Sequence, residues 1–260
     1  MSAIIIVGSD KGGVGKDLIT EGIYLAALKS GAFPALFEIE VAKRLALLYP
    51  AATYISAGAV EPAEIYRNPD VVFAPFDQAT AEWREAELTI VCLGANLTGA
   101  FQAWSTTNGA TAFGGGENLI FAIVMTMARD ALAAGLSNLY ELGRLYPGAR
   151  RVAVLNETAA DFIDGDKNLA RRLDQAQADG APIDTIRIRR MAAPAWGYLQ
   201  NCGPLAEVAQ MTAQQLVELG LPEGPSVRSM ALFERWLNDD LIAPLGAILP
   251  QSRGRNARPK

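Results

Sequence analysis

The fold of this chain is decided by a stretch near its start, Ile4–Leu18, which reads IIIVGSDKGGVGKDL. Its apolar beginning predicts a buried strand, Gly12, Gly13 and Gly15 predict a tight turn, and a helix begins at Lys16. Glycines let successive backbone N–H groups point into one concavity, to which the helix adds its free amides and positive dipole end. This order predicts a phosphate-binding loop, in which Lys16 supplies a positive charge to the β- and γ-phosphates of a nucleotide.

Beyond this stretch, short apolar runs alternate with longer helical patterns, which is typical of a parallel sheet with crossover helices. The expected strands are Ala3–Val7, Pro34–Glu38, Thr89–Leu93, Leu119–Thr126, Val152–Leu155 and Ile183–Arg187, with a further candidate at Val71–Phe73. The expected helices are Asp17–Ser30, Ala128–Leu145, Thr158–Ala178, Pro204–Leu219 and Ser226–Leu241. The Gly- and Thr-rich segment Gly94–Glu117 is expected to be a long loop. We therefore predict an α/β fold, a three-layer P-loop NTPase domain over residues 1–250 with a mostly parallel twisted sheet.

The composition excludes several kinds of catalysis. The chain has 260 residues and no histidine, so Ser-His-Asp and Cys-His nucleophile pairs and His-bearing zinc sites are excluded. Its two cysteines, Cys92 and Cys202, are too few for a structural zinc site or a disulfide framework, which favours reduced thiols in the cytoplasm. No secretory signal is visible, and the longest apolar stretch, Leu119–Ala128, is too short to span a bilayer. We expect a soluble cytoplasmic protein.

The net charge of −5 is unevenly distributed. The last ten residues, 251–260, carry four positive charges and no acidic residue, which leaves 19 basic against 28 acidic residues in the body. This polar segment has nothing to bury, so we expect a disordered basic tail. Two interpretations of the tail are open: a solvated chain end, or a segment that contacts nucleic acid or acidic lipid.

The run Lys11–Lys16, KGGVGK, resembles the deviant Walker A motif of the ParA/MinD family of P-loop ATPases. The extra lysine, Lys11, is the signature of that family, and the resemblance implies that it reaches across a nucleotide sandwich dimer to the phosphates of the partner subunit. The resemblance also implies ATP and Mg²⁺ as cofactors, with Lys11 and Lys16 as catalytic residues. The cofactor-binding residues that it implies in this stretch are Lys11, Gly12, Gly13, Val14, Gly15, Lys16, Asp17 and Leu18.

Two later segments extend the resemblance. The strand ending in Glu38-Ile39-Glu40 stands where the family has a hydrophobic strand ending in Asp-x-Asp, which implies that Glu38 or Glu40 positions the attacking water. Asn156, directly after the strand Val152–Leu155, is similar to the family's asparagine whose side-chain amide reads the adenine edge.

The chain departs from the usual phosphate loop at two positions: Asp10 replaces the first glycine, which the family tolerates, and Asp17 replaces the hydroxyl residue that ligates Mg²⁺. It departs from the family at the end of the strand Thr89–Leu93, where Cys92 or Leu93 replaces the strand-end Asp. Two outcomes are open. Asp17 could bind Mg²⁺ directly, because a carboxylate is a good hard-oxygen ligand. Alternatively its charge repels nucleotide, since two like charges about 4 Å apart cost about 4 kcal/mol at an effective dielectric constant of about 20. We hypothesise Mg²⁺-dependent binding with slow or absent hydrolysis.

The resemblance implies a protein that dimerises on ATP and positions or segregates cargo such as plasmid DNA. An adaptor or cargo protein would stimulate hydrolysis or release. One alternative is a non-hydrolysing nucleotide-binding scaffold in a plasmid partition or conjugative transfer complex, which the residues at positions 17 and 92 favour. Another is a P-loop kinase or ligase that acts on a small metabolite, for which the sequence contains no substrate-pocket signature.

Two surface features bear on partners. The basic residues concentrated in the body are Arg171, Arg172, Arg187, Arg189 and Arg190. They are either solvated arginines paired with Asp174 and Asp184, or a surface that holds DNA without sequence preference, as the resemblance implies. The stripe of Met230, Phe233, Leu237 and Leu241 has helical spacing. Because Glu234, Asp239 and Asp240 oppose an anionic membrane surface, we expect this helix to dock on the core rather than bind a membrane.

Overall fold

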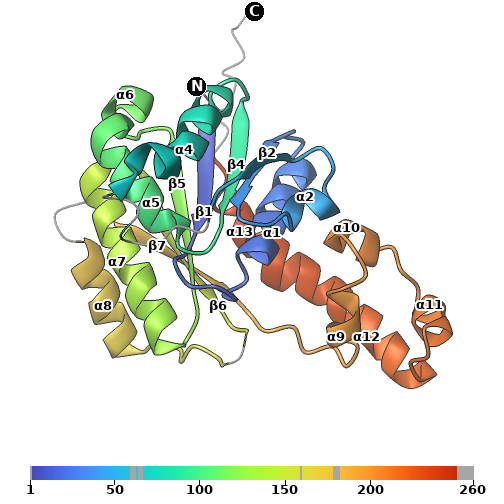
Figure 1. The fold of residues 1–260 in the computed structure, drawn as a ribbon. Coiled ribbons are helices and arrows are strands. Elements are labelled where there is room, and N and C mark those ends of the chain that lie inside the picture. The colour runs from blue at the N-terminus through green and yellow to red at the C-terminus, as the bar shows by residue number, and fades with distance from the viewer. Residues whose placement is uncertain (1, 59–62, 64–66, 159, 178–181, 251–260) are drawn as a thin grey trace, which may run out of the picture.

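Seven parallel strands form one sheet at the centre of the protein (Figure 1). The structure is a computed structural model that describes residues 2–58, 63, 67–158, 160–177 and 182–250. The strands are β1 (Ala3–Gly8), β2 (Ala35–Glu40), β3 (Thr53–Ser56), β4 (Leu88–Leu93), β5 (Leu119–Met125), β6 (Arg150–Asn156) and β7 (Ile183–Ile188). They lie in the order β3-β2-β4-β1-β5-β6-β7. The predicted α/β fold with a parallel sheet is confirmed, and the predicted tail 251–260 lies outside the described residues.

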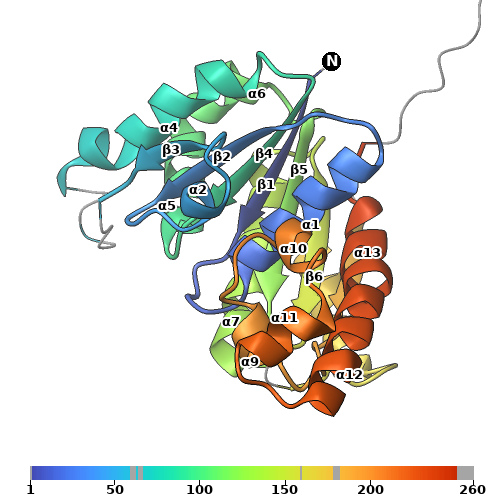
Figure 2. The same ribbon diagram turned by 90° about the vertical axis from the view of Figure 1, so that its right-hand side faces the viewer.

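Helices cover both faces of the sheet, which makes the three predicted layers (Figures 1 and 2). The α-helices are α1 (Lys16–Lys29), α2 (Leu45–Leu48), α4 (Pro69–Trp83), α5 (Leu97–Trp104), α6 (Ala110–Phe113), α7 (Arg129–Leu145), α8 (Lys167–Gln177), α9 (Trp196–Leu199), α10 (Leu205–Val208), α11 (Ala213–Glu218), α12 (Glu223–Arg235) and α13 (Ala243–Gly246). Two π-helical segments are η1 (Ser105–Gly109) and η2 (Trp236–Ile242). Alternate residues of β1 serve the two faces: Ile5 and Val7 pack toward α1 and the C-terminal helices, whereas Ile4 and Ile6 pack toward α4, α5 and α7.

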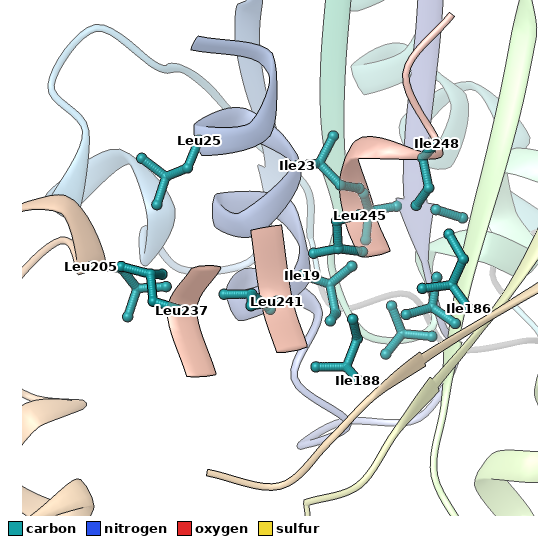
Figure 3. Close-up of a cluster of buried hydrophobic side chains, with 14 of the residues drawn as sticks. Ile19, Ile23, Leu25, Ile186, Ile188, Leu205, Leu237, Leu241, Leu245 and Ile248 are labelled. Carbon is teal, nitrogen blue, oxygen red and sulfur yellow. The ribbon is translucent and has the colours of Figure 1, made fainter. Parts of the chain in front are cut away.

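The C-terminal helix docks against the phosphate-loop helix. Figure 3 shows Leu241 and Leu245 facing Ile19 and Ile23 of α1. This close approach needs the glycine at position 22, because a Cβ there would lie 2.5 Å from Leu245 Cδ1. The predicted apolar stripe is buried at Phe233, Leu237 and Leu241, so the expectation of a docked helix is confirmed. Its start is at Glu223 rather than Ser226, and it continues through the π-helical segment η2 into α13.

Two sequence expectations on the other face are wrong. The segment Val71–Phe73 is not a strand but lies in α4, where Val72, Phe76 and Trp83 are buried at helical spacing. The seventh strand is the short edge strand β3 instead. The segment Gly94–Glu117 is not a loop, because it contains α5, η1 and α6. Phe101 and Trp104 of this segment stack in an aromatic cluster on the sheet, which explains why it is helical.

Two expected helices have different limits in the structure. The helix expected over Thr158–Ala178 begins only at Lys167, because the segment before it folds back on β6: the Phe162 N–H donates to Glu157 Oε1 at 2.9 Å. The helix expected over Pro204–Leu219 is split into α10 and α11. Thr212 starts the second piece with a capping box, accepting from the Gln215 N–H. With α9 and α12, these pieces form a helical lobe, Trp196–Arg235, beside α1 (Figure 2).

Candidate nucleotide-binding site

The predicted phosphate loop connects β1 to α1 at the carboxyl edge of the sheet. Gly13 and Gly15 adopt left-handed backbone with φ of 73° and 89°, which L side chains rarely adopt. Gly15 is also enclosed, since a Cβ there would lie 2.4 Å from Asn156 Nδ2. Glycine is therefore required at position 15 for both conformation and space, and α1 begins without a side-chain cap at the next residue. Its first N–H groups are left for a ligand.

The two lysines of the loop differ in environment. Lys16 is only 7% exposed at the first position of α1, and none of the Asp and Glu residues that the structure describes forms an ion pair with it. Lys11 is on the surface, with a side chain that is 53% exposed, and its Nζ lies 3.6 Å from Asp130 Oδ2 at the start of α7. Lys16 can therefore act inside the loop, whereas Lys11 can reach groups outside it.

Asp10, which replaces the first glycine of the motif, holds the loop to a neighbouring helix. Its Oδ1 accepts a hydrogen bond from the Gly99 N–H in the first turn of α5 at 3.0 Å. Asn96, the N-cap of that helix, has φ 64° and makes no side-chain cap hydrogen bond. Because a carboxylate is favourable at a helix N-terminus, Asp10 supplies the cap that Asn96 does not. The sequence gives no signal for this role, since Gly94–Glu117 has the composition of a loop.

Asp17 and Cys92 contact each other beneath the loop. The Cys92 thiol donates to Asp17 Oδ1, with Sγ and Oδ1 3.6 Å apart. Burial raises the pKa of Cys92 above its usual range, and the charge of Asp17 adds to the increase. The thiol is therefore a protonated donor. Asp17 itself is half-buried and faces a cavity beside the loop.

The carboxylates of Glu38 and Glu40 lie in different environments. Glu38 is 1% exposed, and its two carboxylate oxygens accept hydrogen bonds of 2.8 to 2.9 Å from the backbone N–H groups of Arg44, Leu45 and Ala46. Both oxygens are thus occupied by the N-terminus of α2. Glu40 is half-buried and lies over Gly94, where a Cβ would be 2.4 Å from its carboxylate carbon. Glu40 Oε1 accepts a hydrogen bond from the Val41 N–H at 3.0 Å, so among the oxygens of these two carboxylates Glu40 Oε2 is the one that accepts no hydrogen bond from the described residues.

Asn156, at the end of β6, supports the loop from below. Its Nδ2 donates to the Val14 carbonyl at 2.8 Å, and the residue is buried. The expected contact of this amide with adenine stays a prediction, because in the structure its NH₂ group is used to position the loop. The side chain nevertheless lines the adjoining cavity.

A cavity of about 510 Å³ opens beside the loop, between α1 and the helical lobe. Its lining residues come from the loop and α1, from α2, from the end of β6, from the residues after β6 and β7, from the lobe, and from the start of η2. They are Gly15, Asp17, Leu18, Glu21, Leu48, Asn156, Glu157, Thr158, Arg189, Arg190, Met191, Trp196, Gln200, Gly203, Leu205 and Trp236. The Trp196 and Trp236 rings lie 5.4 Å apart, and Trp236 Nε1 donates to the Arg189 carbonyl at 2.7 Å. Two tryptophan side chains and the polar loop thus border one space.

Glu21 joins the loop helix to the lobe. Its Oε1 accepts from the Tyr49 hydroxyl at 2.5 Å and from the Leu205 N–H. Burial raises the pKa of Glu21, the two hydrogen bonds oppose this, and nearby Asp17 adds to it. Glu21 was not among the predicted site residues, although its position four residues after Asp17 on α1 places both carboxylates on the same side of the helix.

The arginines near β7 are paired with acidic residues. Arg187 binds Glu157 and Asp164, Arg190 Nη2 lies 3.7 Å from Asp161, and Arg189 Nε lies 4.0 Å from Asp240. The expected partner Asp184 instead binds Arg150 at 2.7 Å. Ion pairing thus accounts for these three arginines, and DNA contact stays a prediction.

The fold defines a class, that of three-layer parallel α/β domains of the P-loop NTPase type, and the glycine-rich loop joins the first strand to the first helix. No family model and no curated protein matches the sequence. Among solved structures, the chain is similar to MinD of Aquifex aeolicus in the MinC:MinD cell division complex, with 12% identity, TM-score 0.46 and coverage of 91% of this chain and 96% of that one. A second MinD structure from the same organism has 12% identity, TM-score 0.44 and the same coverage.

The signal recognition particle receptor FtsY of Elizabethkingia anophelis is also similar, with 12% identity, TM-score 0.39 and coverage of 72% of this chain and 58% of that one. Within the described residues, none of the helices combines the length and the apolar character that crossing a bilayer requires.

Proposed function

We propose that this chain binds ATP, with the phosphates in the loop between β1 and α1 and the nucleoside in the adjoining cavity. The observation that carries the proposal is Lys16: a buried ammonium with no acidic partner among the described residues, at the start of a helix whose first N–H groups are free. A volume of about 510 Å³ is within the usual range for small-molecule pockets, and two tryptophan side chains offer faces for a base.

The residues present fit Mg²⁺ only together with phosphate. Asp17 offers one carboxylate, and the described residues contain no group of three or more Asp, Glu or Cys side chains that could hold a metal ion. Mg²⁺ is commonly bound by one or two carboxylates plus substrate phosphates and water. In this proposal Asp17 holds the ion, which when bound neutralises phosphate charge, and nucleotide binds weakly without it.

Hydrolysis in this proposal is slow and depends on Glu40. Phosphoryl transfer needs positioning and electrostatic stabilisation more than a strong base, which Lys16 and the loop amides provide. Glu38 is committed to three backbone N–H groups, so Glu40 is the carboxylate that remains to orient water.

The resemblance to the ParA/MinD motif extends the proposal to assembly. ATP promotes a homodimer in which Lys11 reaches the partner subunit's phosphates, and the dimer positions cargo such as plasmid DNA through an adaptor protein or nonspecific DNA. The exposure of Lys11 supports this role. The alternative, a non-hydrolysing scaffold in a partition or conjugative transfer complex, is favoured by the occupied carboxylate of Glu38 and by the contact of Asp17 with Cys92.

Binding and assembly can be tested separately. ATP is titrated with Mg²⁺ and with EDTA while tryptophan fluorescence is recorded, since Trp196 and Trp236 line the cavity. We expect saturable quenching with Mg²⁺, much weaker binding in EDTA, and loss of binding in Lys16→Ala. No binding by the wild type, or equal binding by Lys16→Ala, would refute the proposal.

Oligomeric state is then measured by light scattering with ATP, ADP and no nucleotide, together with DNA retention. We expect an ATP-dependent dimer that Lys11→Ala does not form. A wild type that binds ATP yet stays monomeric and ignores DNA in every state would exclude the positioning function in favour of the scaffold. Turnover as fast as in an efficient ATPase would exclude the scaffold.

A further inference from the structure

Two of the positions that depart from the usual phosphate loop contact each other, although 75 residues separate them in sequence. P-loop NTPases commonly hold Mg²⁺ with a hydroxyl residue of the loop and an Asp at the end of a nearby strand. In this chain the carboxylate, Asp17, is on the loop helix, and the small protic side chain, Cys92, is on the strand β4. Compared with that common arrangement, the carboxylate and the small protic side chain have exchanged positions.

The geometry gives each member of the pair one task. Cys92 is 3% exposed and pairs with Val7 of β1, so its position is fixed by the centre of the sheet. Its thiol donates to Asp17 Oδ1. Among the residues that the structure describes, none donates a hydrogen bond to Asp17 Oδ2, and the residue lines the cavity. One oxygen is therefore held by the strand while the other is left for a ligand.

We propose that Cys92 is a positioning residue, whose thiol orients Asp17 so that Oδ2 is the protein ligand for a divalent cation bound with the nucleotide phosphates. The inference rests on the proposed nucleotide binding. It explains why a carboxylate at position 17 is compatible with a loop that binds anions, because its charge is directed toward the cation. It also explains why the strand carries no acid here: an Asp at position 92 would face Asp17 and repel it.

The proposed roles of Asp17 and Cys92 predict how substitutions at these two positions change the affinity for the cation. Cys92→Ser keeps a donor of similar size and should preserve cation binding within about threefold. Cys92→Ala removes the hydrogen bond to a charged acceptor and should weaken it about tenfold. Cys92→Asp should weaken it about a hundredfold or more, because two carboxylates then share the site. The double variant Asp17→Thr with Cys92→Asp restores the common arrangement and should recover most of that loss, which is strong non-additivity.

The experiment uses the full chain with a saturating non-hydrolysable ATP analogue and titrates Mn²⁺, whose free concentration is read by electron paramagnetic resonance. Thermal unfolding of each variant without metal is the control for packing. The expected order of Mn²⁺ affinity is wild type, Cys92→Ser, double variant, Cys92→Ala and Cys92→Asp. The inference is overturned if Cys92→Ala binds Mn²⁺ as tightly as the wild type, or if Ser and Ala variants lose affinity equally.

The two proposals fail in different ways. If the wild type binds the analogue neither with nor without Mn²⁺, the proposed function itself fails. If it binds the analogue and Lys16→Ala does not, but Mn²⁺ affinity is insensitive to position 92, only the positioning role of Cys92 is wrong. If the double variant binds Mn²⁺ no better than Cys92→Asp alone, the inference that the carboxylate and the protic side chain have exchanged positions is also overturned.

Discussion

Replacing Gly15 by alanine tests the loop geometry most directly. An alanine at φ 89° incurs a cost of about 1–2 kcal/mol from its left-handed backbone. The new Cβ would also lie 2.4 Å from Asn156 Nδ2, so the amide must move and give up its hydrogen bond to the Val14 carbonyl. A buried polar group that loses its partner costs about 1–3 kcal/mol. We therefore expect Gly15→Ala to lower the free energy of unfolding by about 2–5 kcal/mol and to abolish ATP binding.

Gly13 provides the matched control, because it is also left-handed, with φ 73°, but a Cβ at this position would meet nothing within 4 Å. Gly13→Ala should lose only the backbone contribution of about 1–2 kcal/mol. Urea unfolding at constant pH measures both variants. Adding Asn156→Ala to Gly15→Ala removes the group that the Cβ meets, so the double variant should be more stable than the sum of the two single changes by about 1–3 kcal/mol. Equal losses for Gly13→Ala and Gly15→Ala, or additive effects in the double variant, would refute the reasoning.

Three further changes test other parts of the site. Asp130→Asn removes the exposed ion pair with Lys11, so we expect a free energy of unfolding within about 0.5 kcal/mol of the wild type. Because Lys11 is then free to reach the partner subunit, ATP-dependent dimerisation measured by sedimentation should be up to about fivefold stronger. Weaker dimerisation would contradict the proposed role of Lys11. Glu38→Gln weakens three charge-assisted hydrogen bonds and should lower the free energy of unfolding by about 1–3 kcal/mol. Glu40→Gln should leave the free energy of unfolding nearly unchanged and slow ATP turnover. The reverse pattern would show that Glu38 orients water and Glu40 stabilises the fold. For Glu21, whose folded pKa is raised above its ordinary 4.5, the ionised form is disfavoured by folding, so the stability that it contributes is lost as pH rises through the raised pKa. Glu21→Gln should therefore become more stable relative to the wild type as pH is increased above about 4.5, and a difference in unfolding free energy that does not change with pH would contradict this.

Local patterns predicted much of the central sheet and the loop. The apolar runs of β1, β4 and β5 are buried on both faces, and such strands are visible as continuous hydrophobic sequence. The order of strand, glycines and Lys16 likewise identifies a local structure whose geometry depends mainly on backbone freedom. The limits of α1 and α7 agree with the expected helices to within one residue at each end.

Where the prediction was wrong, distant contacts decided the conformation. The segment Gly94–Glu117 has many Gly and Thr residues, and its helices are held by aromatic packing on the sheet and by Asp10 at the start of α5. The segment after Asn156 is held by Glu157 and Arg187, whose pairing joins β6 to β7. Neither interaction has a local sequence signal, because the partners come together only when parallel strands align.

The sequence by itself determined that this chain has a buried strand, a glycine-rich phosphate loop and a helix in that order, and that Asp17 and Cys92 break the usual pattern. Only the tertiary structure decided what those departures mean. Strand order brings β4 beside β1, and this neighbourhood places the thiol of Cys92 on the carboxylate of Asp17. The tertiary structure also places the Glu38 carboxylate at the N-terminus of α2, where it accepts backbone hydrogen bonds, and places the Glu40 carboxylate beside Gly94. Residue types and spacing specify local chemistry, whereas the direction in which a carboxylate points depends on neighbours that folding brings from elsewhere in the chain.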